Sequence, residues 1–134
     1  MATGKVRFIY RNFVIIGPES MGAARASMCA SEQERFWDYH DMLFANHTGE
    51  NVGDFIDRRL LAFAEMLGLD GGTFRACLSS GRYDDQINQD KARGQTVGVA
   101  STPSFIINGQ LVQGALPFSE FQKVIEAELA KIGS

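Results

Sequence analysis

The stretch Val97–Ala115, VGVASTPSFIINGQLVQGA, decides how the rest of this chain is interpreted. Pro103 opens an apolar run, and that run predicts a strand over Phe105–Ile107. Asn108-Gly109 is the dipeptide most typical of a two-residue hairpin turn, so Gln110–Gln113 is predicted to be the returning strand. Proline cannot donate a hydrogen bond to a sheet and fits at the start of a strand. The peptide bond before this proline is a candidate cis bond, although a trans proline ending a loop is the commoner case.

Length and composition set limits on what this chain can be. With 134 residues, 45% of them hydrophobic and 22% charged, it is expected to form one ordinary globular domain. Its net charge of −3 gives no reason to expect nucleic acid or an anionic membrane as a partner. No apolar run approaches the roughly 18 residues of a membrane-spanning helix, and the N-terminus has no signal-peptide pattern.

The segments before this stretch predict one strand followed by helices. Residues 5–13, KVRFIYRNF, alternate with apolar side chains on both faces, which is typical of a strand covered on both sides. Pro18 suits the first turn of a helix. Asn51 is expected to cap a helix over Val52–Leu67, and Asp70 to cap a short helix that follows. Later segments up to residue 98 are also helical in pattern, and a last helix is predicted to start at Pro117.

His40 lies in a helical pattern rich in aromatic residues, Glu32–Asn46, which invites a catalytic or ligand role. A histidine in such a stripe more often packs and forms hydrogen bonds. No metal-like spacing of His, Cys or acidic residues accompanies it, and a site made of two cysteines and His40 has an incomplete ligand set. No metal site is therefore predicted.

Three segments together resemble the DsbA-like family of thioredoxin-fold protein-disulfide oxidoreductases. They are residues 102–129 (TPSFIINGQLVQGALPFSEFQKVIEAEL), residues 5–13 (KVRFIYRNF) and residues 29–44 (CASEQERFWDYHDMLF). The family's cis-proline loop usually reads Gly-Thr-Pro-Thr-Phe. Here the corresponding residues are Ser101-Thr102-Pro103-Ser104-Phe105, with serine where the family has glycine.

This resemblance implies an α/β fold: an incomplete thioredoxin-like (DsbA-like) fold with a helical insertion between the first strand and the cis-proline loop. Residues 1–134 would form a single DsbA-like domain. Its parts would be a strand at 5–13, the insertion at 19–98, and the loop, hairpin and final helix at 99–134. The family's Cys-x-x-C is absent, so we expect the chain to lack the N-terminal strands and active-site helix that precede residues 5–13 in the family.

The resemblance also implies a function. Ser101, Thr102 and Pro103 would form the loop that faces a substrate peptide. The chain would be the substrate-side portion of a thiol-disulfide oxidoreductase, inactive in redox turnover because it has no Cys-x-x-C. No cofactor is implied. The partner of the full-length parent would be a protein or peptide thiol or disulfide, and its location would be extracytoplasmic, in the cell envelope.

Cys29 and Cys77 are the two cysteines of the chain. A structural disulfide between them would stabilise the fold by about 4 kcal/mol in the chain-entropy model, and an extracytoplasmic location would permit it. Free buried thiols are the plainer alternative. A redox-active pair is a third, although neither cysteine has the Cys-x-x-C arrangement that lowers a thiol pKa.

The missing N-terminal segment has a structural consequence, and the function has alternatives. Without the strand that the family places between residues 5–13 and Phe105–Ile107, both segments would present strand edges, which predicts rearranged pairing or a homodimer. The alternative function is a non-catalytic thioredoxin-like module that binds a peptide or protein. A glutathione-linked enzyme of the same fold is less favoured, because no residue marks a glutathione site.

Overall fold

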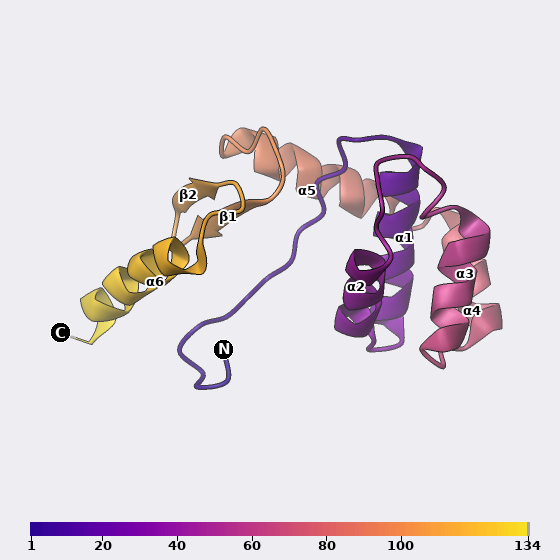
Figure 1. Cartoon of the computed structure of the whole chain (residues 1–134), viewed down its shortest axis with the longest axis horizontal. Helices are drawn as coiled ribbons and strands as arrows, with labels where there is room; N and C mark the ends of the chain where they lie inside the picture. The colour runs from indigo at the N-terminus through magenta and orange to yellow at the C-terminus, as the bar shows by residue number, and fades with distance from the viewer. Residues whose placement is uncertain (134) are drawn as a thin grey trace. The chain divides into compact units, whose positions relative to one another are not determined.

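The computed structural model describes residues 1–133, which form helices and one β-hairpin (Figure 1). These residues separate into two compact units. We call Asn12–Asp90 the helical unit, and Met1–Arg11 together with residues 91–133 the hairpin unit. No helix within residues 1–133 combines the length and the apolar character needed to cross a membrane.

The helical unit is built around its first helix, α1, which contacts α2, α3 and α4 (Figure 1). Alanines on α1 let the neighbouring helices approach closely. The unit's largest fully buried side chains include one from each of four other helices: Tyr39, Leu60, Phe74 and Ile87. The elements of this unit are α1 (Pro18–Glu32), α2 (Phe36–Ala45), α3 (Asp57–Met66), α4 (Gly71–Ser80) and the start of α5 (Asp84–Thr96).

Several helix ends follow the sequence signals. Helix α1 begins at Pro18, as predicted. The Asp70 carboxylate accepts a hydrogen bond from the Thr73 backbone N–H at 2.7 Å, so the predicted cap of α4 is confirmed. Gly81 ends α4 with φ of 63°, a conformation that glycine adopts without steric cost.

The prediction that Asn51 caps a helix over Val52–Leu67 is wrong. Helix α3 begins at Asp57, and the residues before it form a loop. The reason lies in the backbone conformation: Gly53 has φ of 93°, which a right-handed helix does not allow. The Glu19 carboxylate holds this loop by accepting hydrogen bonds from the backbone N–H groups of Gly53 and Phe55, at 2.8 and 3.1 Å. Asn51 itself has φ of 52° and donates its side-chain amide to the Ile16 carbonyl.

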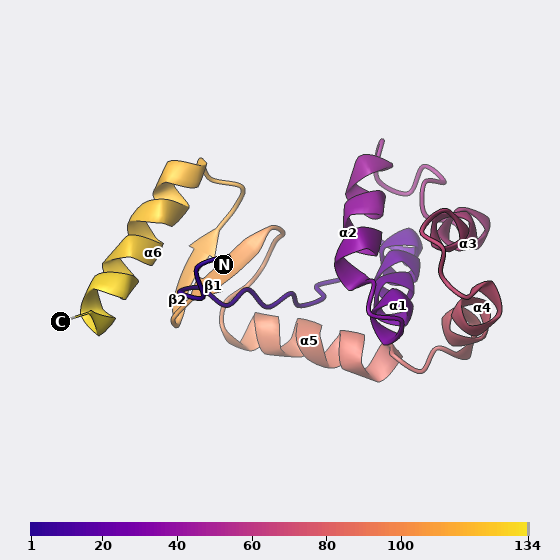
Figure 2. The ribbon, with the colours of Figure 1, turned by 90° about the horizontal axis from the view of Figure 1, so that it is seen from below.

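The hairpin unit contains two antiparallel strands, β1 (Ser104–Ile107) and β2 (Gln110–Gln113), and the last helix, α6 (Phe118–Ile132) (Figure 2). Asn108 and Gly109 both have positive φ, 48° and 88°, as the predicted two-residue turn requires. The Phe105 and Phe121 rings meet edge to face at 4.7 Å, which joins the hairpin to α6. The predicted hairpin and final helix are confirmed.

The strand predicted over residues 5–13 is not formed. Within residues 1–133 the sheet has the order β1–β2, and residues 5–13 contribute no strand to it. Alternation of side chains reports which faces of a segment are apolar, but a strand also needs a neighbouring strand with which to exchange backbone hydrogen bonds. In this segment Ile9 is 53% exposed.

Candidate functional site

The loop that carries Ser101, Thr102 and Pro103 lies between the end of α5 and the start of β1. Gly98 has φ of 94°, and the Val99 N–H donates to the Gly94 carbonyl at 2.9 Å, which closes the last turn of α5. The chain then leaves the helix, and all three residues of the loop are exposed.

Two hydrogen bonds hold this loop against the hairpin. The Ser104 hydroxyl donates to the Ser101 carbonyl at 2.7 Å. The Gly114 N–H donates to the Pro103 carbonyl at 2.8 Å, one step beyond the end of β2. The Thr102–Pro103 peptide bond is cis. Residues 99–117 contain no ionisable side chain, so the loop can offer backbone groups and hydroxyls to a ligand but has no group that transfers electrons.

Cys29 and Cys77 form a disulfide that joins α1 to α4, with an S–S distance of 2.02 Å and a Cα–Cα distance of 5.8 Å. The two residues are 1% and 2% exposed. They belong to the same core cluster as Tyr39 and Phe74. Thiol-disulfide exchange needs a thiolate to reach one of the two sulfurs, and burial of both denies that access in the folded chain.

Ion pairs tie α1 to the segment that follows α4. Arg25 donates from two guanidinium nitrogens to the two oxygens of Asp84, both at 2.6 Å, and this lowers the pKa of the Asp84 carboxyl. The Glu32 carboxylate accepts hydrogen bonds from Arg82 and Tyr83, which lower the pKa of Glu32. These pairs could not be found from the sequence, because 59, 50 and 51 residues separate the partners and no local spacing rule connects them.

The pKa of Asp54 is lowered as well. Its carboxylate accepts hydrogen bonds from the backbone N–H and from the hydroxyl of Thr48. Both bonds lower the pKa of Asp54, and the bond from the backbone N–H has the larger effect. Arg59 lies 3.6 Å from the other oxygen. These contacts fix the loop before α3, and we assign them a structural role.

His40 packs among aromatic rings on α2. Its ring centroid lies 5.2 Å from that of Trp37 and 4.6 Å from that of Phe44. Trp37 is 47% and Phe44 71% exposed, whereas Tyr39 is fully buried and donates its hydroxyl to the Leu60 carbonyl at 2.8 Å. The helix therefore turns Tyr39 toward the core and leaves Trp37 and Phe44 exposed, with His40 partly buried between their rings. No group of three or more His, Cys, Asp or Glu residues within residues 1–133 is placed to hold a metal ion.

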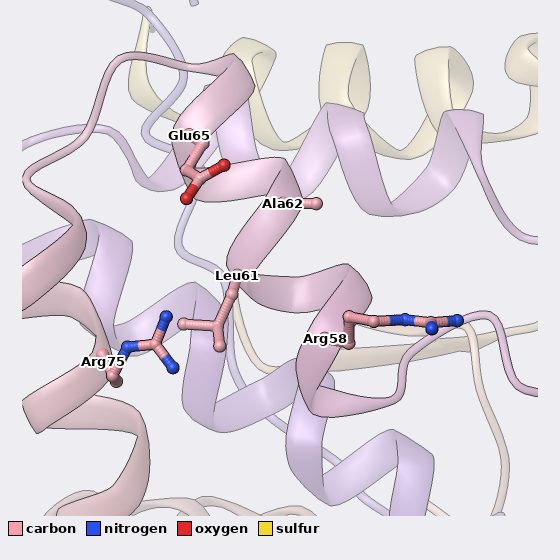
Figure 3. A pocket seen from close by; sticks show the side chains of 5 residues that line it. All are labelled: Arg58, Leu61, Ala62, Glu65 and Arg75. Atoms are coloured by element: carbon pink, nitrogen blue, oxygen red, sulfur yellow. The ribbon is translucent and has the colours of Figure 1, made fainter.

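A hollow of about 470 Å³ lies against α3 and α4 and is lined by two arginines, Arg58 and Arg75, with Leu61, Ala62 and Glu65. Figure 3 shows that the Arg58 side chain extends away from Arg75, while Arg75 lies beside Leu61. The two guanidinium groups do not converge on a common point, so the hollow does not form an anion site.

Comparison with known proteins agrees with this fold. Residues 1–127 match the family model described as Thioredoxin. This chain belongs to the thioredoxin family. Among solved structures, the thiol-disulfide exchange protein alpha-DsbA2 from Wolbachia pipientis has a TM-score of 0.80 at 25% identity over 94% of this chain and 67% of the other. A thioredoxin-like oxidoreductase from Silicibacter pomeroyi has a TM-score of 0.75 at 27% identity, covering 89% and 66% of the two chains.

Two similar proteins are longer than this chain, and the chain matches very different shares of their length. It is 27% identical to the probable disulfide bond formation protein D of Bacillus cereus over 132 residues, which are 96% of this chain and 60% of that protein. It is also 34% identical to the Na(+)/H(+) antiporter NhaA 3 of Salinispora tropica over 111 residues, which are 81% of this chain but 16% of the antiporter. The DsbA-like resemblance and the thioredoxin-like fold class are confirmed by the family match and the two structures.

Proposed function

We propose that this chain is the substrate-side portion of a DsbA-like thiol-disulfide oxidoreductase and that it does not itself turn over disulfides. The observation that carries the proposal is the contrast between its two candidate sites. Ser101, Thr102 and Pro103 are exposed, whereas Cys29 and Cys77 are joined to each other and buried.

The exposed loop supplies a surface for peptide binding. Its carbonyls at Ser101 and Pro103 are already engaged by Ser104 and Gly114. Those two bonds leave the backbone of Thr102 to pair with an extended peptide. The side chains around it are uncharged, so the loop would bind by backbone geometry and would tolerate many peptide sequences. Its partner would be a protein or peptide thiol or disulfide, the substrate of the whole oxidoreductase.

The buried disulfide has a structural role in this proposal. It crosslinks α1 and α4 within one core and closes a loop between residues 48 positions apart. A disulfide of this kind persists in an oxidising compartment, which supports an extracytoplasmic location. The helical unit and the hairpin unit would be parts of one DsbA-like domain.

An insulin-reduction assay with dithiothreitol tests the absence of turnover. We expect the chain to leave the rate at the level of dithiothreitol alone, and we expect the double variant Cys29→Ala/Cys77→Ala to behave identically. A rate above this background that the double variant loses would contradict the proposal and would make these two cysteines an active site.

Peptide binding can be followed separately by NMR chemical-shift changes on adding an unfolded cysteine-containing peptide. We expect shifts at Ser101 and Thr102, and we expect Pro103→Ala to weaken binding. Gln110→Ala changes an exposed residue of the same hairpin on β2 and is the matched control. Equal affinities for the two variants would argue against a substrate role for the loop.

A second candidate is a non-catalytic module that holds a peptide or protein. The observation that favours it is the same geometry: an exposed loop at Ser101–Pro103 and a buried disulfide suit binding without thiol exchange. In-frame codons for a Cys-x-x-C upstream of Met1 in the gene would support the oxidoreductase, and their absence would support the binding module.

A further inference from the structure

The helical unit is acidic, and most of its arginines are engaged within it. Residues 12–90 contain 13 acidic residues, six arginines and no lysine. Four of the arginines form ion pairs with carboxylates of this unit: Arg25, Arg35, Arg59 and Arg82. For the other two, Arg58 and Arg75, the described part of the chain shows no ion-pair partner. Both line the hollow against α3 and α4, which is therefore a basic spot on an acidic unit.

Along α3, the side chains of this hollow follow the order cation, apolar pair, anion. Arg58 and Glu65 are seven positions apart in the sequence, about two helical turns, so they share one face of the helix. In Figure 3 they lie at opposite ends of this segment, with Leu61 and Ala62 between them. Arg58, Ala62 and Glu65 are exposed, and Leu61 is half-buried. The point midway between the two charges falls between Leu61 and Ala62.

This order of charges is complementary to itself when a second α3 runs antiparallel. A two-fold axis through the midpoint would place Arg58 of one copy opposite Glu65 of the other, and the reverse, because both residues are equally far from the axis. Leu61 and Ala62 would meet their counterparts near the axis, where the small Ala62 side chain lets two helices approach closely. In a parallel arrangement like charges would face each other, so the pattern selects the antiparallel one.

We propose that the exposed face of α3 is a self-association surface, on which two copies of the chain pack through antiparallel α3 helices. The occupant is a second copy because it supplies a carboxylate at the Arg58 end and a guanidinium at the Glu65 end, which a small anion does not. Met66, the residue after Glu65, is 71% exposed and would lose water contact there. Exposed ion pairs add little affinity, so the dimer is weak. This inference does not depend on the proposed redox function.

The first test is the mass of the intact chain in solution, measured by sedimentation equilibrium up to millimolar concentration. At about 0.15 M ionic strength, charges more than about 8 Å apart are largely screened, which limits the repulsion between two acidic units. We expect the mass to rise from 14.7 kDa toward twice that value. Arg58→Glu and Glu65→Arg each place like charges opposite one another at both ends, so each should weaken association about tenfold. Glu50→Arg makes the same charge change at an exposed loop residue and should not weaken it.

Charge exchange tests the pairing itself. The double variant Arg58→Glu/Glu65→Arg reverses both pairs together and should associate as the wild type does. Mixing the two single variants should also restore a dimer, because one presents carboxylates at both ends of the stripe and the other guanidinium groups. Each single variant alone should stay monomeric at the concentration used for the mixture. Circular dichroism of every variant confirms that it is folded.

The outcomes separate the proposal from its alternatives. A dimer that both single variants weaken, and that the double variant and the mixture restore, supports antiparallel pairing of α3. A monomer at every concentration overturns it. A dimer that Arg58→Glu and Glu65→Arg leave intact, or that neither the double variant nor the mixture restores, also overturns it, because the interface would then lie elsewhere. If Glu50→Arg weakens association as much as Glu65→Arg does, net charge sets the association and the proposal is wrong.

Discussion

The helical unit and the hairpin unit differ in how much of their own apolar surface they cover. In the helical unit Tyr39, Leu60, Phe74 and Ile87 are completely buried. In the hairpin unit, within residues 1–133, Val112 is the one buried hydrophobic residue. The helical unit also carries the disulfide and the ion pairs of Arg25 and Arg82.

This contrast indicates that the helical unit is the more stable part and that the hairpin unit is the part suited to binding. A unit with a closed core and a crosslink can hold its fold by its own contacts. A hairpin with one helix leaves a strand edge and apolar side chains available to another chain. In this protein the segment of proposed substrate contact, Ser101–Pro103, belongs to the unit with the less complete core.

Removing the disulfide of the helical unit should cause the largest loss of stability. We expect Cys29→Ala/Cys77→Ala to lower the free energy of unfolding by about 4 kcal/mol, because the loop closed by the disulfide is released in the unfolded chain. Urea unfolding followed by circular dichroism measures the change. Wild-type chain reduced under denaturing conditions and refolded with reductant should match the variant. If both keep the stability of the oxidised chain, the disulfide does not support the helical unit.

A matched pair of leucines gives the next largest difference. Leu60 is fully buried on α3, and Leu116 of the hairpin unit is 43% exposed. We expect Leu60→Ala to cost about 3 kcal/mol through lost burial and the cavity it leaves, and Leu116→Ala to cost less than about 0.5 kcal/mol. Thermal and urea unfolding of the two variants compares them directly. Equal costs would mean that the hairpin unit has a core as complete as the helical unit.

The smallest expected effect is a fall in the free energy of unfolding of the helical unit at acid pH. Glu32, Asp54 and Asp84 have lowered pKa values in the folded chain. Their contribution is complete above the ordinary carboxyl pKa of about 4 and is lost as the pH falls through the lowered folded values. Unfolding free energies measured between neutral pH and acid should therefore decline in that window. In the Asp54→Asn variant the free energy of unfolding should fall less steeply as the pH is lowered.

A matched variant on the same unit makes this acid test specific. Asp85→Asn removes an exposed carboxylate at the start of α5 and is the control for the loss of one charge. If Asp54→Asn and Asp85→Asn show the same decline in stability with acid, the hydrogen bonds from Thr48 to Asp54 carry none of the pH dependence.

Local chemistry made much of the fold predictable. Asn108-Gly109 requires positive φ at both residues and so identified the hairpin and its register. Pro18 and Asp70 identified helix starts because a missing N–H and a carboxylate act within one turn. Pro117 located the start of α6 within one residue of its observed first residue, Phe118.

Long-range partners were not predictable from local patterns. Nothing near Asn51 shows that the Glu19 carboxylate accepts the Gly53 and Phe55 N–H groups and holds these residues in a loop. The alternation of residues 5–13 is a property of the segment, while strand formation depends on a neighbour. The sequence left three alternatives for Cys29 and Cys77, and the fold brings their Cα atoms to 5.8 Å, within range of a disulfide. The loop Ser101–Pro103 was located by resemblance, and its substrate role stays a prediction.

The Cys29–Cys77 bond is buried, and we propose that it is a structural crosslink and not a catalytic one. The most direct measurement is the rate at which dithiothreitol reduces it in the native chain, with new thiols trapped by a maleimide and counted by mass spectrometry. We expect two trapped thiols only after unfolding in urea, and very slow reduction of the native chain. If the native chain is reduced as fast as the unfolded chain, the disulfide is open to exchange with a substrate thiol and its role is not merely structural.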